Sequence, residues 1–536
     1  MRSRLESSGQ RVRVMTVFAS LVNAAPWQEW IRPLGNTLGL MAGAGFIALL
    51  GGVLTGLAVQ RVGMRRSGAL DAVWLANLVR SGLVMSIALP LILHAAAWEA
   101  TAGKFGWLVQ LSSGGNLPWV TWIHGVHGIA ILGLATERGL ASIPTSLQES
   151  ISLQRRWRHR LSLSLTLAFP WIGVGLCLVL LLAATEMTVV NLHSVRTIAD
   201  QFYLLHAASP SEASVVAVLG MPMLLASLMI LVWRPIQKRS TVIDAAPWWT
   251  PRGSDLDLAV NPSRPWANGI AAGLSLFALA VCLGIPVAGL LIQAGHTVDV
   301  VEGERLTTWS WRSLVVSLSE APATFQREYT WTFLLGTCTA VISLPIAWLL
   351  ARWARWRPSA QGILDAIALI LFAIPGPVVG LMVVRVFALP LPGLDVIATE
   401  TIIPTCLAVG LRATVVAYGV MRASYAGISD EVIDSARMDG GVTWLIRAVE
   451  IPLLRWHLVL AAACAGMVAA GDVPAMLPVL PPGVVTVSTR LFSLLHSGAR
   501  YQEASLAFWY LAALLVLFVV FRSSRKRHAE KTRLLD

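Results

Sequence analysis

Long apolar stretches recur along the whole 536-residue chain and limit what it can fold into. A helix that crosses a bilayer needs about 20 mostly apolar residues, and eleven stretches meet or approach that length. They lie at 34–58, 69–97, 118–136, 163–184, 213–233, 267–293, 331–350, 363–384, 402–421, 457–471 and 504–521. With 56% hydrophobic and 13% charged residues, the chain has too little polar surface for a soluble globule or a disordered protein. We predict an all-α, polytopic integral membrane protein.

The positions of the basic residues predict the orientation of these spans. Six alternate connections hold 26 Lys and Arg residues, whereas the five opposite connections hold 8. Because basic loops are retained in the cytoplasm, we expect the C-terminus to be cytoplasmic. Much of the net charge of +12 is therefore a topology signal, and no nucleic-acid partner is expected. An odd number of spans would place the N-terminus outside, although residues 1–33 contain five arginines.

The chain also repeats itself, as duplicated transporter bundles do. Residues 68–72 resemble 362–366 at an offset of 294, and Glu149 and Ser150 resemble Asp434 and Ser435 at an offset of 285. Matched segments fall on the same side of the membrane, which predicts a parallel repeat of two bundles with a pore between them. The expected units are a first half (1–233) without a counterpart of the 267–293 helix, a cytoplasmic linker (234–265), a second half (266–522) and a basic tail (523–536).

The stretch from Asp434 to Arg455 lies between two spans on the basic side and is predicted to form a helix, a glycine turn and a second helix. Gly440 or Gly441 would supply the positive φ of the turn, and Pro452 would open the following span. An elbow of this kind is suited to docking on another protein.

This segment resembles the coupling loop of permease subunits of bacterial ATP-binding-cassette importers, whose pattern is Glu-Ala-Ala, three residues, Gly, then Ile-x-Leu-Pro. Asp434, Ala436 and Gly440 fit the pattern, while Asp434 stands for Glu, Ser435 stands for the first Ala, and the spacing from Gly to Pro is one residue short. The resemblance assigns ATPase coupling to seven residues. They are Asp434, Ser435, Ala436, Arg437, Gly440, Gly441 and Pro452.

Residues 486–492, followed by Glu503, Ala504 and Ser505, are similar to the two-domain permeases for ferric iron, thiamine and related solutes. The resemblance implies a bacterial inner-membrane protein that works with two copies of a cytoplasmic ATP-binding subunit. It also implies a periplasmic or lipid-anchored solute-binding protein as a partner, besides membrane lipid. The solute stays open among ferric iron, thiamine, molybdate and polyamines.

The first copy of the loop keeps an acid at Glu149, next to Ser150, but continues into the basic run of residues 155–160 without a glycine. Its turn cannot form in the same way. Either this loop docks weakly on the ATPase, or its arginines dock on acidic groups, or they only retain the loop in the cytoplasm.

Arg80, His127 and Arg412 are basic residues in apolar spans, where they are costly unless they face a cavity or a partner. His127 and Arg412 are related by the offset of 285. The functional hypothesis is that all three line a translocation path for an anionic or chelated solute, and the alternative is pairing between helices. His124 and His127 have a spacing seen among metal ligands, but a third ligand is missing nearby, so no metal site is predicted.

No Gly-x-x-x-x-Gly-Lys-[Ser/Thr] phosphate loop occurs, so the chain is expected to be a transport component without enzymatic activity or a cofactor of its own. A secondary transporter with parallel repeats is the alternative, and it would require a carboxylate or an unwound helix that binds a coupling ion.

Overall fold

The computed structural model describes residues 27–63, 70–103, 116–154, 156–207, 209–239, 265–301, 304–497 and 500–533. The N-terminal 26 residues, most of the predicted linker (240–264) and the last three residues lie outside the described part. Nine helices in the described ranges are long and apolar enough to cross a membrane, and counting two sharply bent helix pairs as one span each gives up to eleven. The prediction of an all-α, polytopic membrane protein is confirmed.

The first half consists of helices joined by short connections. Its elements are α2 (Trp27–Gly63), α3 (Leu70–Ala88), α4 (Leu91–Ala102), α5 (Asn116–Ala141), α6 (Thr145–Ser152), α7 (Trp157–Thr185), α8 (Thr188–Leu192), α9 (Ile198–Gln201), the π-helical turn η2 (Phe202–His206) and α10 (Glu212–Arg239).

The second half begins with extra elements. These are α11 (Pro265–Leu279), η4 (Ala280–Gly284), α12 (Ile285–Ala294), strands β1 (His296–Val301) and β2 (Glu304–Trp309), and α13 (Trp311–Thr324). The strands form an antiparallel hairpin, with His296 opposite Trp309 and Val301 opposite Glu304, which the sequence did not predict.

The remaining elements of the second half follow the order of the first. They are α14 (Gln326–Trp356), α15 (Pro358–Ala373), α16 (Gly376–Phe387), α17 (Leu394–Glu400), α18 (Ile403–Tyr425), α19 (Asp430–Trp444), η5 (Leu445–Glu450), α20 (Ile451–Gly471), α21 (Val473–Met476), η6 (Leu477–Val479), α22 (Val487–Ser497) and α23 (Arg500–Arg533).

Matching breaks in two helices define the repeat. Residues 73–88 and 91–102 meet at 107°, and Pro358–Ala373 and Gly376–Phe387 meet at 94°. Pro90 and Pro375 stand at the two bends, where the residue before a proline is disfavoured in a helix. These positions differ by 285, so the predicted match of 68–72 with 362–366 at an offset of 294 is wrong for the folded chain. The apolar pattern around those residues is too regular to fix the alignment, whereas the prolines do.

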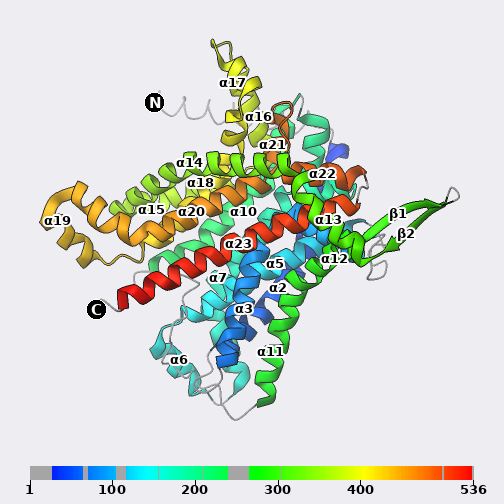
Figure 1. The fold of residues 1–536 in the computed structure, drawn as a ribbon. Helices are drawn as coiled ribbons and strands as arrows, with labels where there is room; N and C mark the ends of the chain where they lie inside the picture. Colours follow the sequence, from blue (N-terminus) through cyan, green and yellow to red (C-terminus); the bar gives the residue numbers. More distant parts are fainter. Residues whose placement is uncertain are drawn as a thin grey trace.

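Each half packs around three long helices (Figure 1): α2, α5 and α7 in the first, and α14, α18 and α20 in the second. Small residues let the helix backbones approach one another closely. A Cβ atom at Gly56 would lie 2.6 Å from the Cβ of Thr136, and Gly336 and Gly466 face each other directly across α14 and α20. Helices in lipid associate through close packing of this kind, because the hydrophobic effect does not drive one apolar helix against another when the surrounding lipid is equally apolar.

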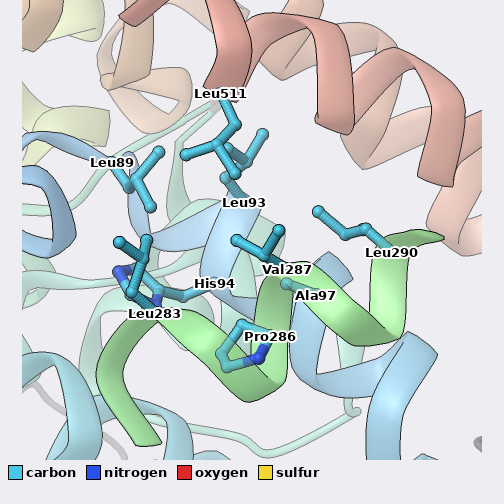
Figure 2. A pocket seen from close by; sticks show the side chains of 9 residues that line it. All are labelled: Leu89, Leu93, His94, Ala97, Leu283, Pro286, Val287, Leu290 and Leu511. Atoms are coloured by element: carbon cyan, nitrogen blue, oxygen red, sulfur yellow. The ribbon is translucent and has the colours of Figure 1, made fainter. Parts of the chain in front are cut away.

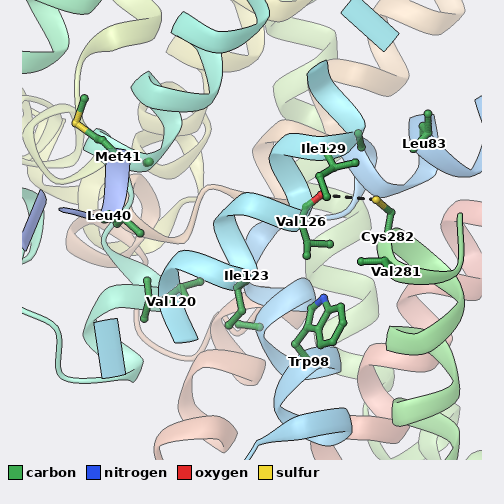
Figure 3. Close-up of a cluster of buried hydrophobic side chains, with 14 of the residues drawn as sticks. Leu40, Met41, Leu83, Trp98, Val120, Ile123, Val126, Ile129, Val281 and Cys282 are labelled. Atoms are coloured by element: carbon green, nitrogen blue, oxygen red, sulfur yellow. Dashed lines mark hydrogen bonds between the residues drawn. The ribbon is translucent and has the colours of Figure 1, made fainter. Parts of the chain in front are cut away.

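The helices α11 and α12 belong to the second half by sequence, but α11 packs against α2 and α3 of the first half, and α12 packs against α4 of the first half as well as α23. Cys282, in η4 between them, donates a hydrogen bond to the carbonyl of Val126 on α5 at 3.7 Å (Figure 3). The same figure shows Trp98 and Ile123 in the buried apolar cluster that η4 helps to cover. The two halves are therefore interlocked and not simply placed side by side.

The elements of interest lie at opposite ends of the bundles. Figure 1 shows α19, α6 and the C-terminal end of α23 toward one end, and the β1–β2 hairpin, α22 and α17 toward the other. The first group contains the connections that are rich in Lys and Arg, so we refer to that end as the basic end.

Candidate functional site

The predicted elbow forms at the basic end of the second half. Its first arm is α19, and the helical geometry breaks at Gly441, whose φ of 72° and ψ of −164° only glycine adopts readily. The chain then continues through η5 into α20, with Pro452 in the first turn. Gly440 has a different role, because a Cβ atom there would lie 2.6 Å from the Cβ of Trp444.

The elbow exposes polar and apolar side chains on its outer side and buries two apolar side chains on its inner side. Ile433 and Ala436 are buried, whereas Asp434, Ser435 and Arg437 are exposed. Met438 is 89% exposed, which is unusual for so apolar a side chain. A largely solvated Met beside acidic residues is a feature of surfaces that bind another protein.

A buried ion network fixes the base of the elbow. Arg352, near the end of α14, donates from Nε to both carboxylate oxygens of Glu450 at 3.1 and 3.0 Å, and the Tyr425 hydroxyl donates to the same carboxylate at 2.9 Å. Glu450 is only 1% exposed. Because three helices meet at this one carboxylate, movement of α19 would be transmitted to α14, α18 and α20.

Two further contacts hold the first arm. Arg355 pairs with Asp430 at the start of α19, and the guanidinium of Arg437 lies 3.9 Å from the ring centroid of Trp356. Arg437 also pairs with Asp434 at 3.7 Å. Arg355 and Arg437 of the second half thus have partners within the chain.

The first copy of the loop has the same plan with a different turn. Glu149 and Ser150 are exposed on α6, at the positions of Asp434 and Ser435, and Ile151 is buried as Ala436 is. Leu153 is 84% exposed at the position of Met438.

The turn that follows α6 differs in sequence from the turn at Gly441. Three further pairs at the offset of 285 are Arg156 with Gly441, Trp157 with Val442 and Arg158 with Thr443. The turn is made by Arg156 in an extended conformation, with φ of −91° and ψ of 121°, so no glycine is required.

The second half's helix break is bridged by charged side chains. Arg412 on α18 donates from Nη2 to the carbonyl of Ile374 at 2.8 Å, and its Nη1 lies 3.4 Å from Asp472 Oδ1. That oxygen lies close to the first residue of α16, because a Cβ atom at Gly376 would be 3.1 Å from it. The arginine therefore faces the negative end of α15 and the carboxylate faces the positive end of α16, which stabilises the dipoles of both half-helices.

The first half bridges its break with histidines. His94 donates from Nε2 to the carbonyl of Ser86 at 2.8 Å, and its ring meets that of His127 with 5.0 Å between centroids. His124 Nε2 lies 3.6 Å from Glu186, the acid that follows α7 as Asp472 follows α20. Glu186 and Asp472, which follow matching spans, thus both face a basic residue of the central helix.

A small pocket adjoins this cluster between α4, α12 and α23, as Figure 2 shows. Its walls are apolar apart from His94, and they include Leu93, Leu290 and Leu511. It offers no polar array that could select a solute.

Arg80 pairs with Glu137 of α5, with Nε donating to Oε1 at 2.6 Å. Arg80 and Arg412 are thus both held by carboxylates between helices, and His127 is packed against His94. These contacts match the alternative of pairing between helices, and a role in solute passage stays a prediction. Within the described ranges no group of three His, Cys, Asp or Glu residues is arranged to hold a metal ion.

Sequence reasoning missed Glu450, Arg352 and Tyr425, as well as Glu137, Asp365 and Arg422. The available signal was the same as for Arg80 and Arg412, namely an ionisable residue in or next to an apolar span. The partner of each could not be identified, because residues 57 or 98 positions apart meet only in the folded chain.

No family model matches the chain, and no curated protein or solved structure matches it either. The length and hydropathy of the described helices show a multi-pass helical membrane protein, an architecture that is compatible with transport.

Proposed function

We propose that the chain is the membrane-spanning subunit of a bacterial ATP-binding-cassette importer, located in the inner membrane. The observation that carries the proposal is the α19 elbow, which is exposed at its outer arm and fixed at its base to three long helices. In this function the elbow docks in a cytoplasmic ATPase subunit, and closure of the ATPases on ATP moves α14, α18 and α20 together. The solute path would open and close alternately between the two halves.

Two copies of the ATPase are part of the proposal. The α6 loop exposes Glu149 and Leu153 at the positions of Asp434 and Met438. It buries Ile151 at the position of Ala436. Each half thus offers one docking helix at the basic end, and a second ATPase subunit would dock on α6 as the first docks on α19. A periplasmic or lipid-anchored solute-binding protein would deliver solute at the opposite end, near α17 and α22.

Ferric iron and thiamine are the solutes that the sequence resemblance favours. Uptake of each, labelled, into proteoliposomes that contain the complete complex would distinguish them.

The test is ATPase capture by a tagged chain in detergent or nanodiscs, co-expressed with an ATPase encoded beside it. Gly441→Val should weaken retention about 5- to 150-fold, because strain of about 1–3 kcal/mol at this backbone conformation opposes the elbow. Gly393→Val is the matched control, since Gly393 also has a positive φ of 84° and open space around it, but lies at the start of α17. It should retain the ATPase.

Equal retention by both variants would show that the elbow is not the docking surface. A secondary transporter is the second candidate, and the two broken helices favour it, since such breaks bind substrate and coupling ions in those proteins. Failure of the folded wild-type chain to retain any ATPase, together with uptake driven by an ion gradient alone, would support this second candidate.

A further inference from the structure

The connection between α6 and α7 exposes a basic and aromatic surface that the proposed coupling function does not use. The exposed residues are Arg156, Trp157, Arg158 and His159. Trp157 is 61% exposed, and the guanidinium of Arg158 lies 5.6 Å from the centroid of its ring. Among the described residues, no carboxylate pairs with Arg156, Arg158 or His159. We call these four residues the α7 basic cap.

The length of α7 places this cap at the depth of the lipid headgroups. A helix of 29 residues is about 43 Å long. The hydrocarbon core is about 30 Å thick and the bilayer with its headgroups about 40–45 Å. A helix of this length that crosses the bilayer along its normal reaches both headgroup layers. The basic end of α7 lies on the side predicted to be cytoplasmic, where anionic lipids give a negative surface potential.

The second half forms the equivalent turn without basic side chains at these positions. The equivalent residues Gly441, Val442 and Thr443 are uncharged. The neighbouring arginines of the second half, Arg355 and Arg437, have Asp430 and Asp434 as partners. Where the second half has a neutral turn, the first half thus has exposed basic side chains that lack a carboxylate partner among the described residues, and an anion from outside the chain can bind them.

We infer that the α7 basic cap is a binding surface for anionic phospholipid headgroups. Arg156 and Arg158 would donate hydrogen bonds to phosphate, and Trp157 would lie at the interface, where its ring meets the acyl chains and its N–H meets the headgroups. Lipid bound there anchors the first half at the membrane surface beside α6, whereas α19 is fixed by contacts within the protein. This inference does not depend on the proposed coupling to an ATPase.

The test uses the full chain in nanodiscs of phosphatidylcholine alone or mixed with phosphatidylglycerol, with retained phosphatidylglycerol counted by native mass spectrometry. Neutralising both arginines (Arg156→Gln with Arg158→Gln) should lower the affinity for phosphatidylglycerol roughly 25-fold, since each basic residue at a membrane surface contributes about fivefold. The charge-preserving pair Arg156→Lys with Arg158→Lys should retain most of the binding.

The matched control neutralises Arg357 and Arg447, two exposed arginines on the same side of the second half. This pair changes the net charge equally and should leave the α7 lipids in place. An equal loss in the control, or no preference for phosphatidylglycerol in the wild type, would overturn the inference. Stabilisation by inorganic phosphate equal to that by the lipid would point to a free-phosphate site, and a response to polyglutamate but not to phosphatidylglycerol would point to an acidic protein. Both of these outcomes would also overturn it.

Discussion

Arg80 and Glu137 form an ion pair between α3 and α5, with 2.5 Å between Nη2 and Oε1. The residues at the same two positions of the second half, each 285 further on, are Asp365 and Arg422. They also pair, with 3.9 Å between Oδ1 and Nε, but with the charges exchanged. The pair therefore belongs to the architecture of the repeat, and its polarity does not.

The reversed polarity predicts that the first half tolerates an exchange. Glu137→Ala should cost up to about 3 kcal/mol, because it leaves a partly buried guanidinium without its partner. Arg80→Asp with Glu137→Arg should recover most of that loss, since the second half already uses this arrangement. Thermal unfolding followed by tryptophan fluorescence measures both effects, and an exchange variant as unstable as the single variant would show that α3 and α5 require the present polarity.

Glu450 is predicted to hold the elbow in position. Glu450→Ala removes the acceptor of Arg352 and Tyr425 inside the protein, which should cost about 3 kcal/mol and loosen the chain locally. Hydrogen exchange should then become faster in α19 and η5 and remain unchanged in α5. Glu431→Ala is the control, because Glu431 is exposed on α19. Unchanged exchange in the Glu450 variant would refute the anchoring role.

Gly440 and Trp444 are predicted to compensate for each other. A methyl group at position 440 would meet the Cβ and Cγ of Trp444 at 2.6 Å, so Gly440→Ala should cost about 1–3 kcal/mol through overpacking. Adding Trp444→Gly removes both the Cβ and the ring atoms of this contact and should restore part of the loss. A double-mutant cycle on the melting temperature checks this, and simple additivity of the two changes would mean that the backbone shifts to avoid the contact.

Asp200, in the short helix α9 at the end opposite α19, predicts a pH effect. Burial raises the pKa of Asp200 above its ordinary value of 3.8, although hydrogen bonding from Asn191 and the charge of Arg196 oppose the change. The folded chain then holds its proton more tightly than the unfolded chain, so this residue lowers stability as the pH rises through the unfolded pKa to the folded one.

Asp200→Asn should remove that slope while keeping an acceptor for Asn191. We expect the variant to gain on the order of 1 kcal/mol or less at neutral pH and to differ least from the wild type at the acid end. Melting curves between pH 4 and pH 7, roughly the window in which a displaced carboxyl titrates, test this. A wild-type advantage at neutral pH would show that the pairing with Arg196 outweighs burial.

The sequence predicts the spans, the basic end, the repeat and the elbow, because each depends on a property of a short stretch of residues. Hydropathy over about 20 residues identifies a span, the distribution of Lys and Arg orients it, and Gly440 and Gly441 beside Pro452 indicate a turn. The odd number of spans and the arginine-rich N-terminus conflict in the sequence, and the N-terminal residues lie outside the described part of the chain.

Only the tertiary structure decided which residues meet. That Glu137 faces Arg80, that Glu450 joins three helices, and that Gly441 and not Gly440 has the positive φ depend on how the helices rotate and approach one another. The breaks at Pro90 and Pro375 set the true offset of the repeat, which regular apolar sequence could not define. An apolar stretch determines that a helix enters the membrane, but most apolar residues can replace one another in lipid. Close packing at a few small residues and pairing of a few charged residues therefore determine which helices contact each other.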